Sequence, residues 1–253
     1  MTDRRIALVT GGGRGIGRST ALALAAQGTR VVVTYRSGAD AAAGTVQEIR
    51  AAGGDAFAMR LDIGDVGSFG TFTTELATTL RRRWGSSRLD VLVNNAGIGL
   101  FGRLEDVTPE AFDELVGTNF RGTFFVIQAL VPLLGDGGRI INVSTSLTRH
   151  ISPGTSVYSA SKAAVEVLSR SLASELGPRG IRINTVAPGP SATDFNSGAM
   201  RDDAGLRETL AAQTSLGRVG DPQEIGDAIA ALASDGLRWV TGERLEVSGG
   251  ALL

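Results

Sequence analysis

The chain alternates short apolar segments with longer helix-like segments, and this alternation limits its fold more than any other feature of the sequence. Several of the apolar runs are continuous, as buried parallel strands are. Candidate helices between them include residues 108–134, 158–177 and 222–234. We therefore expect right-handed βαβ crossovers and an α/β fold, a doubly wound parallel sheet of about seven strands with helices on both faces. The predicted strands are residues 6–10, 30–35, 55–61, 91–94, 138–144, 182–187 and 244–247.

The first predicted strand leads directly into a glycine-rich turn. Residues 10–17 read Thr-Gly-Gly-Gly-Arg-Gly-Ile-Gly, and residues 19–26 have helix character. Glycine lets the backbone adopt positive φ and approach a phosphate closely. The start of the following helix offers free N–H groups and a partial positive charge. This strand–turn–helix unit predicts a pyrophosphate-binding turn, and the alternative is a turn that is tight without binding a ligand.

A tyrosine and a lysine at helical spacing are candidates for proton transfer. Tyr158 and Lys162 are four residues apart, so on a helix both project from one face. A free phenol has a pKa of about 10, and a nearby ammonium favours the phenolate. We therefore expect Lys162 to lower the pKa of Tyr158 and the pair to act as a general acid/base unit. Tyr and Lys at this spacing also occur on solvated faces, which is the alternative.

Together these features resemble the short-chain dehydrogenase/reductase family, and the likeness covers almost the whole chain in the right order. The family's glycine pattern, its Asn-Asn-Ala-Gly motif and its Tyr-x-x-x-Lys motif are all present, and so are single positions that the family uses. The matched positions are Thr10, Gly11, Gly15, Gly17, residues 94–97, Asp62, Asn119, Tyr158, Lys162, Pro188, Gly189, Thr193, residues 240–242, Gly249 and Gly250. A single Rossmann-type NAD(P)-binding domain over residues 1–253 is the implied organisation.

The resemblance also implies which residues bind the cofactor. It places them in the glycine turn, at the ends of the second, third and fourth strands, and around the Pro-Gly turn. They are Gly11, Arg14, Gly15, Ile16, Gly17, Tyr35, Arg36, Ser37, Asp62, Ile63, Asn95, Ala96, Gly97, Tyr158, Lys162, Pro188, Gly189, Ser191 and Thr193.

The end of the second strand favours NADP(H) over NAD(H). An acid there would bind the adenosine ribose of NAD and repel the 2′-phosphate of NADP. The residues are Tyr35, Arg36 and Ser37, and by resemblance such an acid would fall at Tyr35. Two guanidinium groups, from Arg14 and Arg36, can clamp a 2′-phosphate, and Ser37 can add a neutral hydrogen bond. The alternative is that one or both arginines point to water.

The resemblance implies reversible hydride transfer between NADP(H) and a carbonyl/secondary-alcohol pair. Tyr158 would protonate the alkoxide, Lys162 would also bind the nicotinamide ribose, and Asn119 would hold a water behind Lys162. The family's serine, thirteen residues before its tyrosine, is replaced by Thr145. The Thr145 hydroxyl can still donate a hydrogen bond to the substrate oxygen, although its β-methyl restricts χ1. Ser146 is the alternative for this role.

The predicted substrate pocket is mostly apolar, which suits a ketone of medium size. Residues 195–214 are a candidate lid over it. The overall pattern resembles 3-oxoacyl-acyl-carrier-protein reductases, but residues 135–138 offer no basic cluster for an acidic carrier. The alternatives are a sugar or secondary-alcohol dehydrogenase working oxidatively, and a non-catalytic NADP(H) sensor. The candidate pocket residues are Leu100, Phe101, Leu147, His150, Ile151, Phe195 and Met200.

Composition excludes several other classes of protein. A net charge of −1 gives no reason to expect nucleic acid or an anionic membrane as a partner. The chain has no cysteine and one histidine, His150, so no metal site is expected. The longest apolar run, residues 124–134, is too short to span a bilayer, and we expect no signal peptide before the first strand. We expect a cytoplasmic enzyme with a small-molecule substrate and, by resemblance, a homotetramer or dimer built through residues 108–134 and 158–177.

Overall fold

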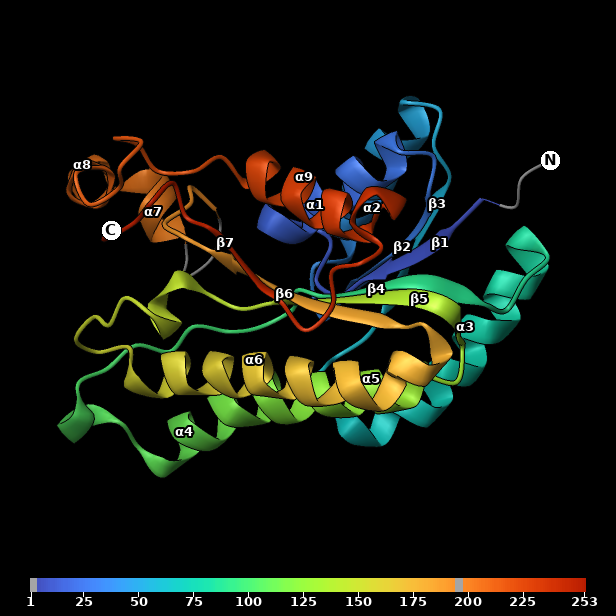
Figure 1. Ribbon diagram of the computed structural model, residues 1–253, viewed down its shortest axis with the longest axis horizontal. Helices are drawn as coiled ribbons and strands as arrows, with labels where there is room; N and C mark the ends of the chain where they lie inside the picture. The colour runs from blue at the N-terminus through green and yellow to red at the C-terminus, as the bar shows by residue number, and fades with distance from the viewer. Residues whose placement is uncertain (1–3, 194–197) are drawn as a thin grey trace.

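A computed structural model describes residues 4–193 and 198–253. Within these residues seven strands form one parallel sheet in the order β3-β2-β1-β4-β5-β6-β7 (Figure 1). The predicted fold class, a doubly wound parallel sheet, is therefore confirmed. The strands are β1 (Ile6–Val9), β2 (Arg30–Tyr35), β3 (Ala56–Arg60), β4 (Leu89–Asn94), β5 (Leu134–Val143), β6 (Arg182–Pro188) and β7 (Arg244–Val247).

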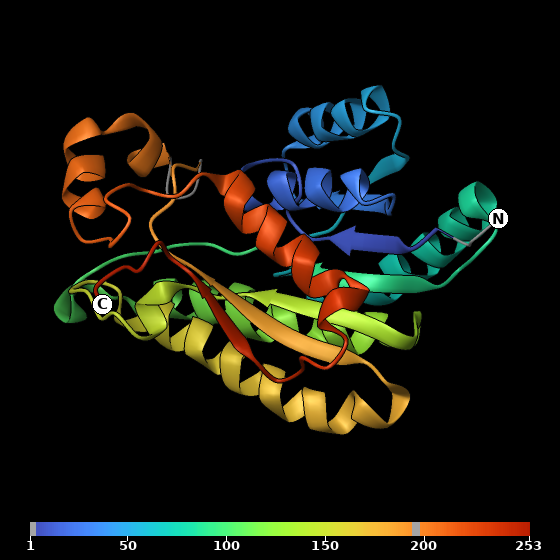
Figure 2. The ribbon, with the colours of Figure 1, turned by 45° about the horizontal axis from the view of Figure 1, so that its top comes forward.

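Helices cover both faces of the sheet. Figures 1 and 2 show α1, α2 and α9 on one face and α3, α5 and α6 on the other, with α7 and α8 at one end. No helix within residues 4–193 and 198–253 is long and apolar enough to cross a bilayer. The helices are α1 (Gly15–Ala26), α2 (Ala39–Ala51), α3 (Phe69–Trp84), α4 (Pro109–Val116), α5 (Thr123–Leu130), α6 (Ser156–Leu176), α7 (Ala199–Asp202), α8 (Ala204–Ala211) and α9 (Pro222–Ala233).

Two apolar cores hold these layers together, and strand β1 contributes to both. Ile6 and Leu8 pack in the core beneath α3, α5 and α6, whereas Ala7 and Val9 pack in the core beneath α1, α2 and α9. All four residues are buried, so β1 is continuously apolar, as a strand covered on both faces must be. The strand order reverses between β1 and β4, and ligands of such sheets bind beyond the carboxyl ends of the strands at this point.

The predicted helix over residues 108–134 is present as one continuous helical segment from Pro109 to Leu130, and its predicted end is four residues too late. Helix α4 ends at Val116, a π-helical turn (η3, Gly117–Gly122) follows, and α5 ends at Leu130. Pro132 has no N–H with which to continue the helical hydrogen bonds, which accounts for the end of α5 just before it. Strand β5 then begins at Leu134, four residues before the predicted start at Gly138. The other predicted strands and helices differ from the observed ones by two residues or fewer at most ends.

Candidate active site

The glycine turn after β1 has a conformation that side chains would prevent. Gly11 and Gly15 have φ of 64° and 51°, a region that residues with a Cβ rarely adopt. A Cβ on Gly17 would lie 2.3 Å from the Gly11 carbonyl oxygen, so the start of α1 could not pack so closely against the turn. Helix α1 has neither a side-chain cap nor an acidic residue in its first turn, which leaves its first N–H groups available to an anion.

Side chains from the loop after β4 brace this turn. The Thr10 hydroxyl accepts hydrogen bonds from the backbone N–H groups of Asn95 and Ala96, both at 3.0 Å. The Asn95 side chain donates to the carbonyl oxygens of Thr10 at 2.9 Å and Gly11 at 3.2 Å. Asn95 is among the residues predicted to bind the cofactor, and its side-chain amide holds the glycine turn in place.

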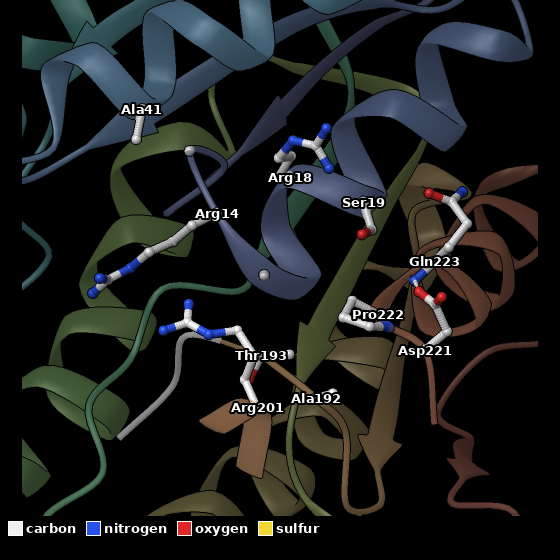
Figure 3. A pocket seen from close by; sticks show the side chains of 12 residues that line it. Arg14, Arg18, Ser19, Ala41, Ala192, Thr193, Arg201, Asp221, Pro222 and Gln223 are labelled. Carbon is white, nitrogen blue, oxygen red and sulfur yellow. Dashed lines mark hydrogen bonds between the residues drawn. The ribbon is translucent and has the colours of Figure 1, made fainter. Parts of the chain in front are cut away.

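A cavity of about 500 Å³ opens at the start of α1 and contains three arginines (Figure 3). Arg18 pairs with Glu48 of α2, and Arg201 pairs with its neighbour Asp202. Arg14 makes no ion pair with any residue that the structure describes. The cavity therefore combines free helix N–H groups with an uncompensated guanidinium, which fits the pyrophosphate and phosphates of a dinucleotide. Its lining residues are Gly13, Arg14, Gly15, Arg18, Ser19, Ala41, Ala192, Thr193, Arg201, Asp221, Pro222 and Gln223.

The predicted cofactor residues at the ends of β2 and β3 lie outside this cavity. Tyr35 is half-buried, and Arg36 and Ser37 are exposed in the loop after β2. The Arg36 carbonyl oxygen accepts a hydrogen bond from the Arg60 side chain, and the Arg36 guanidinium makes no ion pair within the described part of the chain. Asp62 accepts from the Gly64 N–H at 2.9 Å and so closes its own turn. Of the two arginines that were predicted to clamp a 2′-phosphate, Arg14 lines the cavity and Arg36 does not.

Arg201, which lines the cavity, was not among the predicted cofactor residues. It lies in helix α7, far along the chain from the glycine turn, and Figure 3 shows its guanidinium on the same side of the cavity as that of Arg14. No local pattern marked it, because its position depends on how the segment after β6 folds back over the sheet.

Backbone at the end of β6 completes this side of the site. The Gly189 N–H donates to the Val247 carbonyl oxygen at 3.0 Å, and a Cβ on Gly189 would lie 2.6 Å from the Ser248 Cα. The buried hydroxyl of Ser191 donates to the Gly189 carbonyl oxygen at 3.0 Å. Thr193 is also buried and lies 3.4 Å from the place of a Gly15 Cβ. The Pro188–Gly189 turn therefore brings Thr193 to the glycine turn.

Thr145 and Tyr158 meet at the carboxyl end of β5. Both side chains are buried, and a hydrogen bond joins them. Thr145 is extended at the start of the short turn η4 (Ser146–Thr148), and the Phe101 ring packs edge-on against Tyr158 with centroids 5.3 Å apart. Ser146 is one position further into the turn, and the structure records no hydrogen bond from its hydroxyl among the described residues. Of the two candidates for the serine role, the geometry favours Thr145.

Lys162 and Asn119 lie behind Tyr158. The Lys162 ammonium donates to the Val143 carbonyl oxygen at 2.9 Å. The Asn119 side chain donates to the Ile98 carbonyl oxygen and accepts from the Ile98 N–H, both at 2.9 Å. A Cβ on Gly97 would lie 2.9 Å from the Asn119 oxygen and 3.3 Å from the Lys162 nitrogen. Asn119 thus ties the loop after β4 to the π-helical turn η3 beside the lysine.

Burial sets the proton affinities of the pair. It raises the pKa of Tyr158 to about 12, against the opposing effect of the hydrogen bond from Thr145. Burial also lowers the pKa of Lys162 to about 8. The expectation that Lys162 lowers the pKa of Tyr158 is wrong for the isolated chain. Desolvation of the phenolate is the largest cause of the shift, and the ammonium of Lys162 is itself desolvated and engaged with the Val143 carbonyl.

The predicted substrate pocket is only partly assembled from the residues named for it. Leu100, Phe101 and Ile151 are exposed, and His150 lies 3.3 Å from a Glu246 carboxylate oxygen. Phe195 and the side chain of Met200 lie outside the described residues. The described part of the candidate lid, residues 198–214, contains the short helices α7 and α8.

This fold and this arrangement of Thr145, Tyr158 and Lys162 define a nucleotide-binding oxidoreductase. A family model described as Enoyl-(Acyl carrier protein) reductase matches residues 11–251, and the chain belongs to this short-chain dehydrogenase/reductase family. Versicolorin reductase 1 of Aspergillus parasiticus is 39% identical over 260 residues, which cover 98% of this chain and 97% of that protein. A 3-oxoacyl-acyl-carrier-protein reductase of Staphylococcus aureus is 39% identical and is covered over 99% of both chains.

A solved structure is similar to this chain in fold as well as in sequence. The angucycline C-6 ketoreductase LanV with bound NADP has a TM-score of 0.93 and 42% identity, over 98% of this chain and 95% of that chain. The predicted family is therefore confirmed.

Proposed function

We propose that this protein is an NADPH-dependent ketoreductase acting on medium-sized, largely apolar ketones. The observation that carries the proposal is the buried, hydrogen-bonded pair of Thr145 and Tyr158 in front of Lys162, at the same sheet edge as the arginine-containing cavity. Two similar proteins, named versicolorin reductase 1 and angucycline C-6 ketoreductase, support the reduction of a ketone.

The cofactor would be held by the glycine turn and the cavity beside it. The N–H groups at the start of α1 would bind the pyrophosphate, Arg14 a phosphate of the adenosine half, and Thr193 the nicotinamide half. NADPH, when bound, supplies the hydride for the carbonyl carbon.

The protein's own part in the reaction is to orient the carbonyl and supply a proton. Thr145 would donate a hydrogen bond to the substrate oxygen and so fix its position. Tyr158, with a pKa of about 12, is fully protonated near neutral pH and can protonate the alkoxide as it forms. Lys162, with a pKa of about 8, is mostly an ammonium there and stabilises the phenolate that results. Asn119 would hold a water that returns the proton.

Tyr158 would act as the acid in reduction and as the base in oxidation, so its pKa does not fix the direction of the reaction. The names of the similar proteins are those of reductases, which supports reduction over a sugar or secondary-alcohol dehydrogenase working oxidatively. A carrier-bound 3-oxoacyl substrate is the second candidate, because the similar Staphylococcus aureus protein carries that name.

The experiment that tests the function measures NADPH oxidation by the purified protein. The panel contains a bicyclic ketone such as 2-tetralone, a 3-oxoacyl thioester free of carrier protein, and a sugar. We expect turnover of the bicyclic ketone and the highest kcat/KM for it. Preference for the thioester would move the assignment to the second candidate. Tight NADPH binding without turnover of any compound would indicate a sensor.

Replacing Arg14 by Ala tests the cofactor preference. Because a charge-assisted hydrogen bond to a phosphate contributes about 1.5–3 kcal/mol, we expect the Kd of NADPH to rise by about 10-fold or more, with the Kd of NADH unchanged. Fluorescence titration with each nucleotide measures both constants. Arg36→Ala is the comparison, since Arg36 lies outside the cavity and its replacement should matter less. Equal losses for NADPH and NADH would mean that Arg14 does not read the 2′-phosphate.

We also propose that residues 1–253 form one domain, which a single sheet with strands from Ile6 to Val247 supports. The proposed assembly is a homotetramer or dimer, supported by exposed apolar side chains at Phe112 of α4 and Val167 of α6. The proposed location is the cytoplasm, which suits a chain that has no cysteines and therefore forms no disulfides.

A further inference from the structure

Arg244 lies in the edge strand β7, and its guanidinium is buried against the loop that carries Thr145. The side chain is 8% exposed. Its Nε donates to Glu166 at 2.8 Å, and its Nη1 donates to Glu246 at 2.6 Å. Its Nη2 donates to the Thr145 carbonyl oxygen at 3.2 Å and to the Thr148 hydroxyl at 3.0 Å. One side chain therefore connects the last strand of the sheet to both ends of the turn that begins at Thr145.

Glu166 is the common acceptor of this cluster. It lies on α6, four residues after Lys162, so it shares a helix face with the lysine. One of its oxygens accepts from the Ser144 hydroxyl at 2.6 Å, from the Thr148 hydroxyl at 2.8 Å and from Arg244. Residues 144–148 are thereby attached to the helix that presents Tyr158 and Lys162, and Arg244 closes the connection from the other side.

Arg244 balances the negative charges of the two carboxylates in this cluster. Glu166 and Glu246 are two carboxylates with side chains only 11% and 20% exposed. Arg149 approaches Glu246 at 3.8 Å, and His150 approaches its other oxygen at 3.3 Å. Arg244 is the cation that bonds to both carboxylates, and its planar fork reaches the Thr145 carbonyl at the same time. A lysine ammonium could keep the charge but could not make these bonds together.

Threonine at position 145 makes such a support necessary. A serine hydroxyl can change χ1 to find the substrate oxygen, whereas the β-methyl of threonine restricts χ1. The direction of the Thr145 hydroxyl therefore follows from the position of its backbone. The carbonyl of that same residue is the group that Arg244 holds.

We propose that Arg244 is a positioning residue for reduction, which aims the Thr145 hydroxyl by holding the Thr145 backbone. This inference rests on the proposed ketoreductase function. Arg244 touches neither substrate nor cofactor in this scheme, so its loss should lower kcat and leave the Kd of NADPH unchanged.

The test compares Arg244→Lys, Thr145→Ser and the double variant with wild type, using NADPH and 2-tetralone. Because a displacement of about 1 Å at a reacting group can cost about 100-fold, we expect Arg244→Lys to lower kcat by about 10-fold to 100-fold. The kcat of the double variant is compared with that of Thr145→Ser, and the loss caused by Arg244→Lys should be much smaller in that background than in the wild type. Arg139→Lys is the matched control, since Arg139 is a largely buried, ion-paired arginine in the middle of β5 and its replacement should leave kcat unchanged.

A second readout does not depend on turnover. Arg244→Lys should accelerate amide hydrogen exchange in residues 145–150, including the Leu147 N–H that donates to the Thr145 hydroxyl, and Arg139→Lys should not. Unchanged exchange there, or a kcat loss that is equally large in the Thr145→Ser background, would overturn the positioning role. A wild-type protein that binds NADPH and reduces no ketone would refute the proposed function, while the exchange comparison would still decide whether Arg244 holds the turn.

Discussion

Phenylalanine at position 158 should remove ketone reduction and leave NADPH binding intact. Tyr158 is the group expected to donate the proton, and general acid catalysis of this kind contributes about 10²-fold to 10⁴-fold to a rate. We therefore expect kcat to fall by at least about 10²-fold in Tyr158→Phe. Phenylalanine keeps the ring that packs against Phe101, so the fold and the cofactor site should survive. Stopped-flow or steady-state assays of NADPH oxidation measure the loss of kcat, and fluorescence titration measures the Kd of NADPH.

A matched control comes from the neighbouring residue of the same helix. The Ser159 hydroxyl bonds only to Thr155 in the described structure, so Ser159→Ala removes a hydroxyl without touching the site. It should have wild-type kcat. If Tyr158→Phe retained comparable activity, the proton would have to come from another group, and the assignment of Tyr158 would be abandoned.

Methionine at position 162 should make the protein more stable and much less active. Burial lowers the pKa of Lys162 from 10.5 to about 8, and each pH unit corresponds to about 1.4 kcal/mol, so burying the ammonium costs about 3 kcal/mol. Methionine removes that cost and also the hydrogen bond to the Val143 carbonyl, which is worth about 1 kcal/mol. We expect Lys162→Met to raise the free energy of unfolding at pH 7 by about 2 kcal/mol. Without the ammonium beside the phenolate, kcat should fall by about 10²-fold.

The pH dependence of stability gives this prediction a sign that can be checked. Below pH 8 the lysine is protonated in both the folded and unfolded states, so its full cost is present. Between pH 8 and 10.5 the unfolded state binds more protons than the folded state, so wild-type stability should rise relative to Lys162→Met. Urea unfolding of both proteins at pH 7, 8, 9 and 10 measures the difference. Parallel stability curves would mean that the pKa of Lys162 is not lowered by burial.

Local patterns in the sequence were sufficient for the architecture and for much of the site. Continuous apolar runs such as Ile6–Val9 are typical of strands that are covered on both faces, so these runs were enough to predict a parallel sheet. The glycine turn and the Tyr158–Lys162 pair are short-range features, and the backbone spacing between their members is set by a turn or a helix. The π-helical turn inside the predicted helix could not be predicted, because its form depends on the hydrogen bonds between Asn119 and the loop at Ile98.

Other properties depend on groups that are distant in the sequence. The pKa of Tyr158 went in the opposite direction from the expectation, because the sequence shows the neighbouring lysine and not the depth of burial. Arg201 lines the cavity and Arg36 does not, because the chain after β6 returns to the glycine turn. Thr145 rather than Ser146 faces Tyr158 because of how the turn leaves β5.

The sequence by itself therefore determined the fold class, the family, the glycine turn and the identity of the proton-transferring pair. Each of these follows from short motifs or from the spacing of residues that are close together in the chain. The tertiary structure alone decided which hydroxyl meets Tyr158, how burial shifts the two pKa values, and that Arg244 reaches the Thr145 backbone from β7. Arg244 and Thr145 are far apart in the chain, and only the packing of the edge strand against the loop after β5 brings them together. Desolvation and such long-range contacts are properties of the packed molecule.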